Sequence, residues 1–246
     1  MSSPRAKDVA VRPEEIADAD CGPPRLDRVH NGVYVPAVMT SAMAEDVSVG
    51  RYKGRLAENY RFPEFLDQVQ QLEALVAGAW KGGGGPRRNR NVRLVFTRGG
   101  VAIPVAVKAF GRQSPLKDWN DLLRGSRARR SWLAGAFLRG KGVGTPPPVG
   151  FLERWEGVRL AESYYLAEYQ DQTSSFKDEL IHLFHDEPEC DKFMSLLECV
   201  AEAVRTMHEA GFQHNDLGNQ NILLKRVDET AWGGVQFIDL NRSRIK

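Results

Sequence analysis

Apolar residues recur along the chain at two spacings, one typical of helices and one typical of strands. From Phe62 to Val76 they stand three or four positions apart, which predicts an amphipathic helix that ends at Gly82–Gly85. Two extended runs, NVRLVFTR and VAIPVAVKAF, flank Gly99-Gly100, and this pattern predicts a β-hairpin. Pro104 in the second run indicates a bulge or an edge position, because proline cannot donate a ladder hydrogen bond.

Farther along the chain, helical patterns become longer. A helix is expected over residues 116–140, and TPPPVGFLERW then leads into a strand that continues to Tyr169. SFKD fits a capping box, so a second helix should begin near Ser175. A third helix should end at Gly211, and its apolar face should consist of Phe193, Leu197, Val200, Ala201, Val204 and Met207. Strands over NILL and VQFIDL follow, with a Gly-Gly turn at 233–234.

The order of these elements predicts an α+β fold with two lobes and a cleft between them. Residues 1–28 are polar and weakly patterned, which is typical of a loose leader. Residues 29–168 should form a β-rich N-lobe with its preceding helix, and residues 169–246 a mainly helical C-lobe. The link between the lobes should lie near Ala167.

Composition excludes several classes of protein. Hydrophobic content of 42% and charged content of 27% are typical of a globular domain. The net charge of +2, without an aromatic RNA-binding motif, argues against a nucleic-acid partner. Cys21, Cys190 and Cys199 have no metal-ligand spacing, which favours reduced thiols in a cytoplasmic protein. No apolar run is long enough to span a bilayer, so any membrane contact should be peripheral.

The candidate chemistry lies in FQHNDLGNQNILL and VQFIDLNRSRIK. His214, Asp216 and Asn221 match the H-x-D-x-x-x-x-N loop of kinases. A carboxylate such as Asp216 can orient an attacking hydroxyl and accept its proton. The Asn221 amide oxygen and the Asp239 carboxylate are suitable ligands for Mg²⁺. Lys108, at the end of VAIPVAVKAF, would place a positive charge on the phosphates.

Each residue also has a structural interpretation. Asp216 and Asn221 with Gly218 could form an ordinary turn, but their order along the chain with Lys108 and Asp239 favours a site. His214 is better explained as a residue that hydrogen-bonds the loop backbone than as a catalyst.

The segments HNDLGNQNILL and FIDLNRSR, with RARRSWLAGAFLRGKGVGTPPPVG before them, resemble the lipopolysaccharide kinase (Kdo/WaaP) family. The resemblance runs from about Asn91 to Lys246 and implies a protein-kinase-like fold that uses ATP and Mg²⁺. The implied acceptor is a sugar of the lipopolysaccharide inner core, heptose or Kdo. Asp216 would be the base, Asn221 and Asp239 the metal ligands, and Lys108 the phosphate contact. The backbone of the link Ala167-Glu168-Tyr169 would meet adenine, and the protein could act at the cytoplasmic face of the inner membrane.

The chain departs from the family pattern in several places. Ser131 stands where many relatives carry a helix acid, so Asp118, Asp121 or a later acid would have to orient Lys108. No G-x-G-x-x-G is present, and Gly82–Gly85 is more typical of a connector than of a phosphate loop. Asp239-Leu240-Asn241 replaces the usual Asp-aromatic-Asp, and Asn215 replaces the arginine of H-R-D. Relatives continue past Lys246 with a basic helical tail, so the C-lobe is expected to be truncated.

These departures leave two alternative functions open. One is a kinase of small molecules or of protein Ser/Thr residues. The other is a pseudokinase, which binds nucleotide or partners without turnover. Two basic groups also remain open, because each could contact anions or simply face solvent. They are Arg124, Arg127, Arg129, Arg130, Arg139 and Lys141 in the predicted helix, and Arg242 and Arg244 near residue 246.

Overall fold

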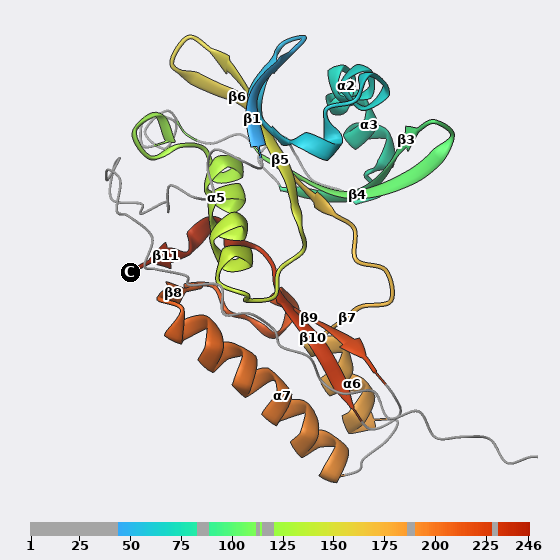
Figure 1. Cartoon of the computed structure of the whole chain (residues 1–246), viewed down its shortest axis with the longest axis vertical. Helices are drawn as coiled ribbons and strands as arrows, with labels where there is room; N and C mark the ends of the chain where they lie inside the picture. Colours follow the sequence, from blue (N-terminus) through green and yellow to red (C-terminus); the bar gives the residue numbers. More distant parts are fainter. Residues whose placement is uncertain (1–43, 83–88, 112–113, 115–120, 186–189, 228–230) are drawn as a thin grey trace, which may run out of the picture.

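The computed structural model describes residues 44–82, 89–111, 114, 121–185, 190–227 and 231–246. The expected leader over residues 1–28, which includes Cys21, lies outside these ranges. Figure 1 shows a strand-rich upper region and a lower region with two helices and short strands, and helix α5 stands between them. The antiparallel sheet with separate helices confirms the predicted α+β class.

The upper region is an antiparallel sheet of six strands. In spatial order these are β1 (Ala44–Val49), β2 (Tyr52–Ala57), β5 (Pro148–Glu156), β6 (Arg159–Glu168), β4 (Val101–Phe110) and β3 (Arg90–Arg98). The predicted β3–β4 hairpin is confirmed. Gly99 and Gly100 both have positive φ, which a type I′ turn requires and glycine adopts without strain. Strand β4, which carries Lys108, is therefore paired on both sides.

Two features of this sheet differ from the sequence prediction. The prediction of a single strand up to Tyr169 is wrong, because the chain forms β5, turns at Gly157 and returns as β6. The turn has only one glycine, Gly157, which lies between Glu156 and Val158, so it lacks a strong hairpin signal. The β1–β2 hairpin was also not predicted, because its buried residues Val49, Tyr52 and Leu56 do not alternate regularly.

Pro104 lies neither at a bulge nor in an edge strand. The β3–β4 register is continuous through Pro104, which lies opposite Val95. Pairing of β4 with β6 begins one residue later, at Val105. The Pro104 carbonyl accepts a hydrogen bond from the Tyr169 amide at 3.2 Å, so this side of the residue faces the end of β6. The nitrogen of Pro104 therefore lies just beyond the end of the β4–β6 ladder, where no N–H donor is needed.

Helices α2 (Pro63–Gln70) and α3 (Leu72–Ala79) pack against the sheet at β3 (Figure 1). The predicted continuous helix is interrupted at Gln71, whose φ of −100° and ψ of 15° depart from helical values. Phe65, Val69 and Leu72 are fully buried in one apolar cluster with residues of the sheet. Each such side chain contributes roughly 1.5–3 kcal/mol when it leaves water.

The helix predicted over residues 116–140 is interrupted, because residues 121–124 are helical and α5 (Arg127–Gly140) begins only after a break at residues 125–126. Gly125 has φ +78°, which interrupts the helical path, and the Ser126 hydroxyl accepts the Arg129 amide at 3.0 Å as an N-cap. Residues 115–120, which include Trp119 and Asp118, lie outside the described ranges.

Helix α5 contributes side chains to two of the three apolar clusters in the described residues. Trp132 packs with Phe110 and Phe151 of the sheet, whereas Phe137 and Leu138 belong to the core of the lower region. The position of α5 is therefore fixed by the sheet and by the lower region at once.

The lower region contains α6 (Phe176–His185), α7 (Cys190–Glu209) and two small sheets. The first sheet has the order β10 (Trp232–Phe237), β9 (Ile222–Arg226) and β7 (Ser174–Ser175), and the second pairs β8 (Phe212–Gln213) with β11 (Arg244–Ile245). The Ser175 hydroxyl accepts the Asp178 amide at 3.1 Å, so the predicted capped start of α6 is confirmed.

The predicted apolar face of α7 is only partly confirmed. Val200 and Met207 are buried as expected. The third buried side chain is Leu196, however, whereas the predicted Phe193 and Ala201 are exposed. The buried face is therefore rotated slightly around the helix from its predicted direction.

The predicted turn at Gly233-Gly234 is wrong. Both glycines lie inside β10, and the register with β9 shifts between Gly233 and Gln236. The connection from β9 to β10 instead lies between Val227 and Ala231, whose backbones are hydrogen-bonded at 2.9 Å. The glycines therefore mark an irregular strand rather than its beginning.

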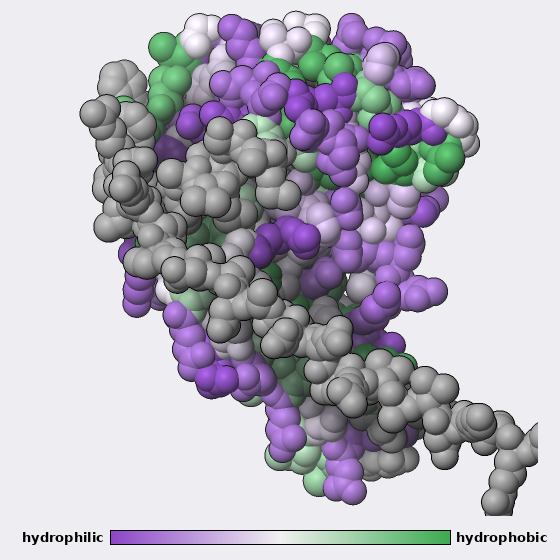
Figure 2. Space-filling model, in the orientation of Figure 1, coloured by the Kyte–Doolittle hydropathy of each residue, from purple (hydrophilic) through white to green (hydrophobic). Residues whose placement is uncertain are grey.

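Hydrophilic side chains cover much of the face shown in Figure 2. An apolar group stands at the free end of the β3–β4 hairpin, where Val95 and Val101 are exposed. Within the described ranges, no helix is both long enough and apolar enough to cross a membrane.

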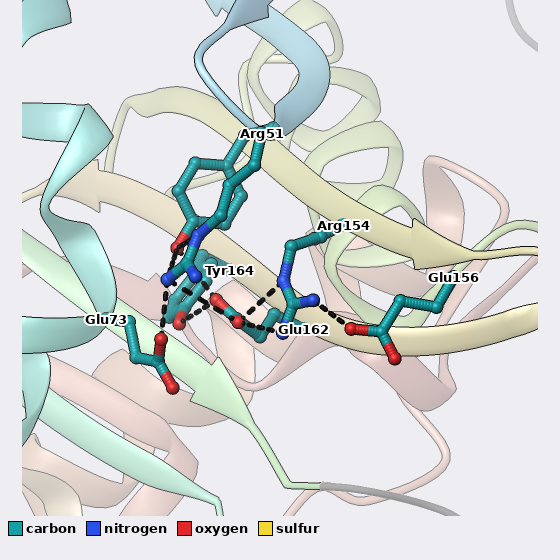
Figure 3. Close-up of polar contacts among 7 residues, drawn as sticks. Arg51, Glu73, Arg154, Glu156, Glu162 and Tyr164 are labelled. Atoms are coloured by element: carbon teal, nitrogen blue, oxygen red, sulfur yellow. Dashed lines mark hydrogen bonds and ion pairs between the residues drawn. The ribbon is translucent and has the colours of Figure 1, made fainter.

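A cluster of charged and phenolic groups joins β2, β5 and β6 (Figure 3). One Glu162 oxygen accepts hydrogen bonds from Tyr52 at 2.7 Å and Tyr164 at 2.8 Å, and the other accepts Arg154 Nε at 2.7 Å. Burial alone would raise the pKa of the Glu162 carboxyl, but these three donors outweigh it and lower the pKa. The charged form of Glu162 is therefore favoured by folding.

We expect Glu162→Gln to lower the free energy of unfolding by about 1–3 kcal/mol near neutral pH, because it removes charge-assisted hydrogen bonds. Since folding lowers the pKa of Glu162, its contribution is complete above the unfolded value of about 4.3. The contribution is lost as the pH falls through the lower folded value. Urea unfolding of both proteins between about pH 7 and about pH 3 should show the difference narrowing.

The matched control is Glu156→Gln. Glu156 pairs with the same Arg154, but its side chain is 58% exposed. Its loss should change the free energy of unfolding by less than about 0.5 kcal/mol. Equal effects of the two substitutions, or a constant difference across the pH range, would contradict this account of Glu162.

Candidate active site

The loop between β8 and β9 carries the predicted H-x-D motif. His214 is 1% exposed, and its Nε2 lies 2.8 Å from the Ile238 carbonyl oxygen. This contact confirms the interpretation of His214 as a residue that bonds the backbone. The β8–β11 pairing, in which Gln213 lies opposite Arg244, holds the start of the loop against the segment that follows β10.

Asp216 and Asn221 are joined within this loop. Asn221 Nδ2 donates to the Asp216 carbonyl at 2.9 Å, and the Asn221 amide donates to the Gly218 carbonyl at 2.8 Å. Asn221 is buried, whereas the Asp216 carboxylate is 39% exposed. The loop thus has the turn geometry that its composition allows, and it also presents a carboxylate to solvent.

Asp239 lies beside Asn221 because β9 and β10 are paired up to their ends. Ile222 lies opposite Phe237, and the Ile238 amide donates to the Asn221 carbonyl at 3.0 Å. Asp239 then adopts left-handed backbone angles, with φ 63° and ψ 45°. Such angles cost about 1–3 kcal/mol in a residue other than glycine and persist where contacts hold them, often at functional sites.

Lys108 reaches the segment around Asp239 from strand β4 of the six-stranded sheet. Its Nζ lies 2.6 Å from Asp239 Oδ1, and the two side chains are 14% and 27% exposed. Asn241 Nδ2 donates to the same Asp239 oxygen. The structure therefore brings Lys108, Asp216, Asn221 and Asp239 into one cluster, although Lys108 and Asp239 come from different regions.

Helix α5 provides no acid to Lys108 within the described residues. Ser131 is buried, and its hydroxyl donates to the Arg127 carbonyl at 2.9 Å within the same helix. Asp121 pairs with Arg130 at 2.8 Å. Of the acids that the sequence offered as substitutes, the partner is the later one, Asp239, while Asp118 lies outside the described ranges.

Arg130 makes a link to the site that sequence reasoning missed. Its guanidinium donates to Asp121, to the Gly125 carbonyl at 2.6 Å, and through Nε to the Asn241 carbonyl at 3.3 Å. The Asp121 side chain is 2% exposed and that of Arg130 is 24% exposed, so the carboxylate of this pair is shielded from solvent. The sequence showed only a run of arginines, and no local signal separated Arg130 from the rest.

The other basic residues of α5 divide by position. Arg127 bonds Asn89 at 3.2 Å and the Gly111 carbonyl, and it stacks on the Phe110 ring. Arg129 is exposed and lies near the start of the helix. Three further cations are exposed, namely Arg124, Arg139 and Lys141. Of the glycines predicted as a connector, Gly83–Gly85 lie outside the described ranges.

Glu168 and Tyr169 lie at the end of β6, on the path between the two regions. The Glu168 amide donates to the Pro147 carbonyl at 2.9 Å and the Tyr169 amide to the Pro104 carbonyl. The Glu168 carboxylate accepts the Tyr60 hydroxyl at 3.0 Å, and Arg93 stacks on the Tyr169 ring. Because both amides are engaged, a nucleotide would meet these residues through other groups.

The oxygen atoms of the cluster fit a hard cation. Asn221 uses Nδ2 and Asp239 uses Oδ1 in the contacts described above, so Asn221 Oδ1 and Asp239 Oδ2 have no hydrogen-bond donor among the described residues. Mg²⁺ commonly takes one or two such protein oxygens and completes its shell with phosphates and water. In the same ranges there is no group of three or more His, Cys, Asp or Glu residues suited to a metal ion.

The fold is protein-kinase-like. It brings together a lysine on a strand, an H-x-D loop with its asparagine, and an aspartate that follows two paired strands. Residues 115–246 match the lipopolysaccharide kinase (Kdo/WaaP) family, and the chain belongs to this family. It is also similar to a solved structure of WaaP in complex with acyl carrier protein, with 25% identity and a TM-score of 0.50. That match covers 71% of this chain and 66%, just under two thirds, of the WaaP chain. A comparison with curated proteins gave no match.

We expect Lys108→Met to lower the free energy of unfolding by about 1–2 kcal/mol, because it leaves the partly buried Asp239 without its cation. In a double-mutant cycle measured by urea unfolding, Asp239→Asn should cost less in the Lys108→Met background than in the wild type.

The control is Lys53→Met, which removes an exposed lysine of β2. It should change the free energy of unfolding by less than about 0.5 kcal/mol. Strict additivity of Lys108→Met and Asp239→Asn would show that the two side chains do not interact in solution.

Proposed function

We propose that this protein is an ATP- and Mg²⁺-dependent kinase that phosphorylates a sugar hydroxyl of the lipopolysaccharide inner core, on heptose or Kdo. Family membership supports this acceptor class. The 2.6 Å contact between Lys108 Nζ and Asp239 Oδ1 carries the proposal, because it joins a strand lysine to the segment beside Asp216 and Asn221.

Each residue has one task in this proposal. Asp216 orients the acceptor hydroxyl and takes its proton as the new O–P bond forms and the bond from the γ-phosphorus to the ADP oxygen breaks, which releases ADP. The partial exposure of Asp216 leaves its carboxylate accessible. Lys108 binds the phosphates of ATP. Asn221 and Asp239 hold Mg²⁺, which when bound neutralises charge on the phosphates.

The proposed nucleotide position lies between an N-lobe of residues 29–168 and a C-lobe of residues 169–246. Glu168 and Tyr169 would contact adenine at the link. We place the reaction at the cytoplasmic face of the inner membrane, with peripheral contact only. A surface that binds an anionic acceptor is supported by the exposed cations at and near α5, which are Arg124, Arg129, Arg139 and Lys141.

Replacing Asp216 tests the proposed base. Asp216→Asn should lower phosphoryl transfer from labelled ATP to purified core saccharide by about 10²–10⁴-fold, because the amide cannot accept the proton. Calorimetric titration should show that ATP·Mg²⁺ still binds. Asp67→Asn, at an exposed position in α2, should keep wild-type transfer. Full transfer by Asp216→Asn would refute the assignment.

The acceptor is tested by substrate choice. Transfer should be fastest with core saccharides that contain heptose or Kdo. Preference for an aminoglycoside, another small molecule or a protein Ser/Thr residue would keep the proposed chemistry but replace the acceptor.

A second candidate is a nucleotide-binding module without turnover. This candidate is favoured because α5 offers no acid to Lys108, which pairs with Asp239 instead. The proposed phosphate contact and the proposed metal ligand are therefore already engaged with each other. At about 100 times the dissociation constant, ATP·Mg²⁺ should raise Tm by about 5–10 °C in either case. Transfer together with this shift supports the kinase. A shift without transfer or ATP hydrolysis supports the module, and no shift argues against both.

A further inference from the structure

We propose that Arg242 is a positioning residue for the Asp216 carboxylate and that Asn215 holds Arg242 in place. This inference rests on the proposed role of Asp216 as the base. It assigns a function to two residues that the kinase motif leaves without one.

The contact between Arg242 and Asp216 engages one oxygen of the carboxylate. Arg242 Nη1 lies 3.3 Å from Asp216 Oδ2, and the two side chains are 67% and 39% exposed. A pair this exposed contributes little to folding stability. It does restrict rotation of the carboxylate, whose terminal torsion has a broad energy minimum. Asp216 Oδ1 has no donor among the described residues, so it can face an acceptor hydroxyl.

The backbone of Arg242 is held against the same loop as Asp216. Asn215 Nδ2 donates to the Arg242 carbonyl at 3.0 Å. Arg242 is the last residue of the short helix η3 (Leu240–Arg242), and the Ser243 amide closes this helix by donating to the Leu240 carbonyl. Strand β11 then pairs with β8 immediately before the H-x-D motif. The guanidinium is therefore presented to Asp216 by its own segment rather than by a free surface loop.

Asn215 has the conformation that this contact requires. Its φ is 55°, in the left-handed region that asparagine enters more readily than most residues. From there its side chain reaches the Arg242 carbonyl. Position 215 is the arginine position of an H-R-D loop, so here the cation near the aspartate is supplied by Arg242 while Asn215 fixes the backbone that carries it.

The charges of the site are thus arranged as two separate pairs. Lys108 faces Asp239, which belongs to the proposed metal site, and Arg242 faces Asp216, which belongs to the acceptor side. Arg244 lies two residues farther along the same segment and is exposed in β11. It provides a matched control, because it carries the same charge on the same segment.

Steady-state transfer to core saccharide tests the role of Arg242. Arg242→Gln should lower kcat by about 10–100-fold, because a misplaced base loses its alignment with the hydroxyl, and should change KM for ATP by less than about twofold. Arg242→Lys should recover part of the loss, since it retains the charge. Arg244→Gln should behave as the wild type.

Two substitutions of Asn215 separate its hydrogen bond from its backbone angles. Asn215→Gly keeps the left-handed conformation without strain and removes only the side chain, whereas Asn215→Ala also introduces strain. Asn215→Gly should lower kcat by about 3–10-fold in the wild type. It should have almost no further effect in Arg242→Gln, because both changes remove the same alignment.

Each result decides between outcomes. If Arg242→Gln matches Arg244→Gln, or if it changes KM for ATP alone, the positioning role is wrong although the kinase proposal stands. Additive effects of Asn215→Gly and Arg242→Gln would refute the role of Asn215. If the wild type transfers phosphate to no acceptor, the proposed function fails first, and the inference fails with it. Unchanged unfolding curves for all variants exclude loss of the fold as the cause.

Discussion

The ion pair between Lys108 and Asp239 is the contact on which the rest of the site depends. The strand lysine and the aspartate after β10 are 131 residues apart in sequence (239 − 108), yet their charged atoms are 2.6 Å apart. Both side chains are largely shielded from water, so their attraction is stronger than that of a surface pair. Their contact places Lys108, the proposed phosphate contact, beside Asp239, a proposed metal ligand, and phosphoryl transfer requires both groups close together.

Helix α5 contacts the segment that carries Asp239 and does not contact Lys108 through an acid. In protein kinases an acid on the corresponding helix pairs with the lysine. Here Ser131 bonds its own helix, and Arg130, paired with the buried Asp121, donates to the Asn241 carbonyl. The helix is thus tied to the backbone two residues after Asp239 instead of to Lys108. Because α5 also packs in two apolar clusters, one against the sheet and one in the lower region, it can still relate the sheet to the lower region.

Features encoded by local sequence were the ones that could be predicted. The dipeptide Gly99-Gly100 forms a hairpin turn because regular strands flank it, whereas Gly233-Gly234 becomes a strand irregularity whose register depends on pairing with β9. The spacing of the H-x-D motif identified Asp216 and Asn221, and the structure places them in one loop. The partner of Lys108 and the link through Arg130 depend on how distant segments pack, so no local pattern could specify them.

The backbone conformation at the site explains why the sequence predicts which residues belong to the site but does not predict the orientation of their side chains. Of the three non-glycine residues with positive φ in the described ranges, Asn215 and Asp239 belong to this cluster. Each conformation costs about 1–3 kcal/mol and is retained here by side-chain contacts, from Asn215 to Arg242 and from Lys108 and Asn241 to Asp239. Strain that is held by distant partners leaves no periodic signal in the sequence. The orientation of the two aspartates is therefore a property of the assembled fold, and the same contacts that hold the strain also aim the carboxylates.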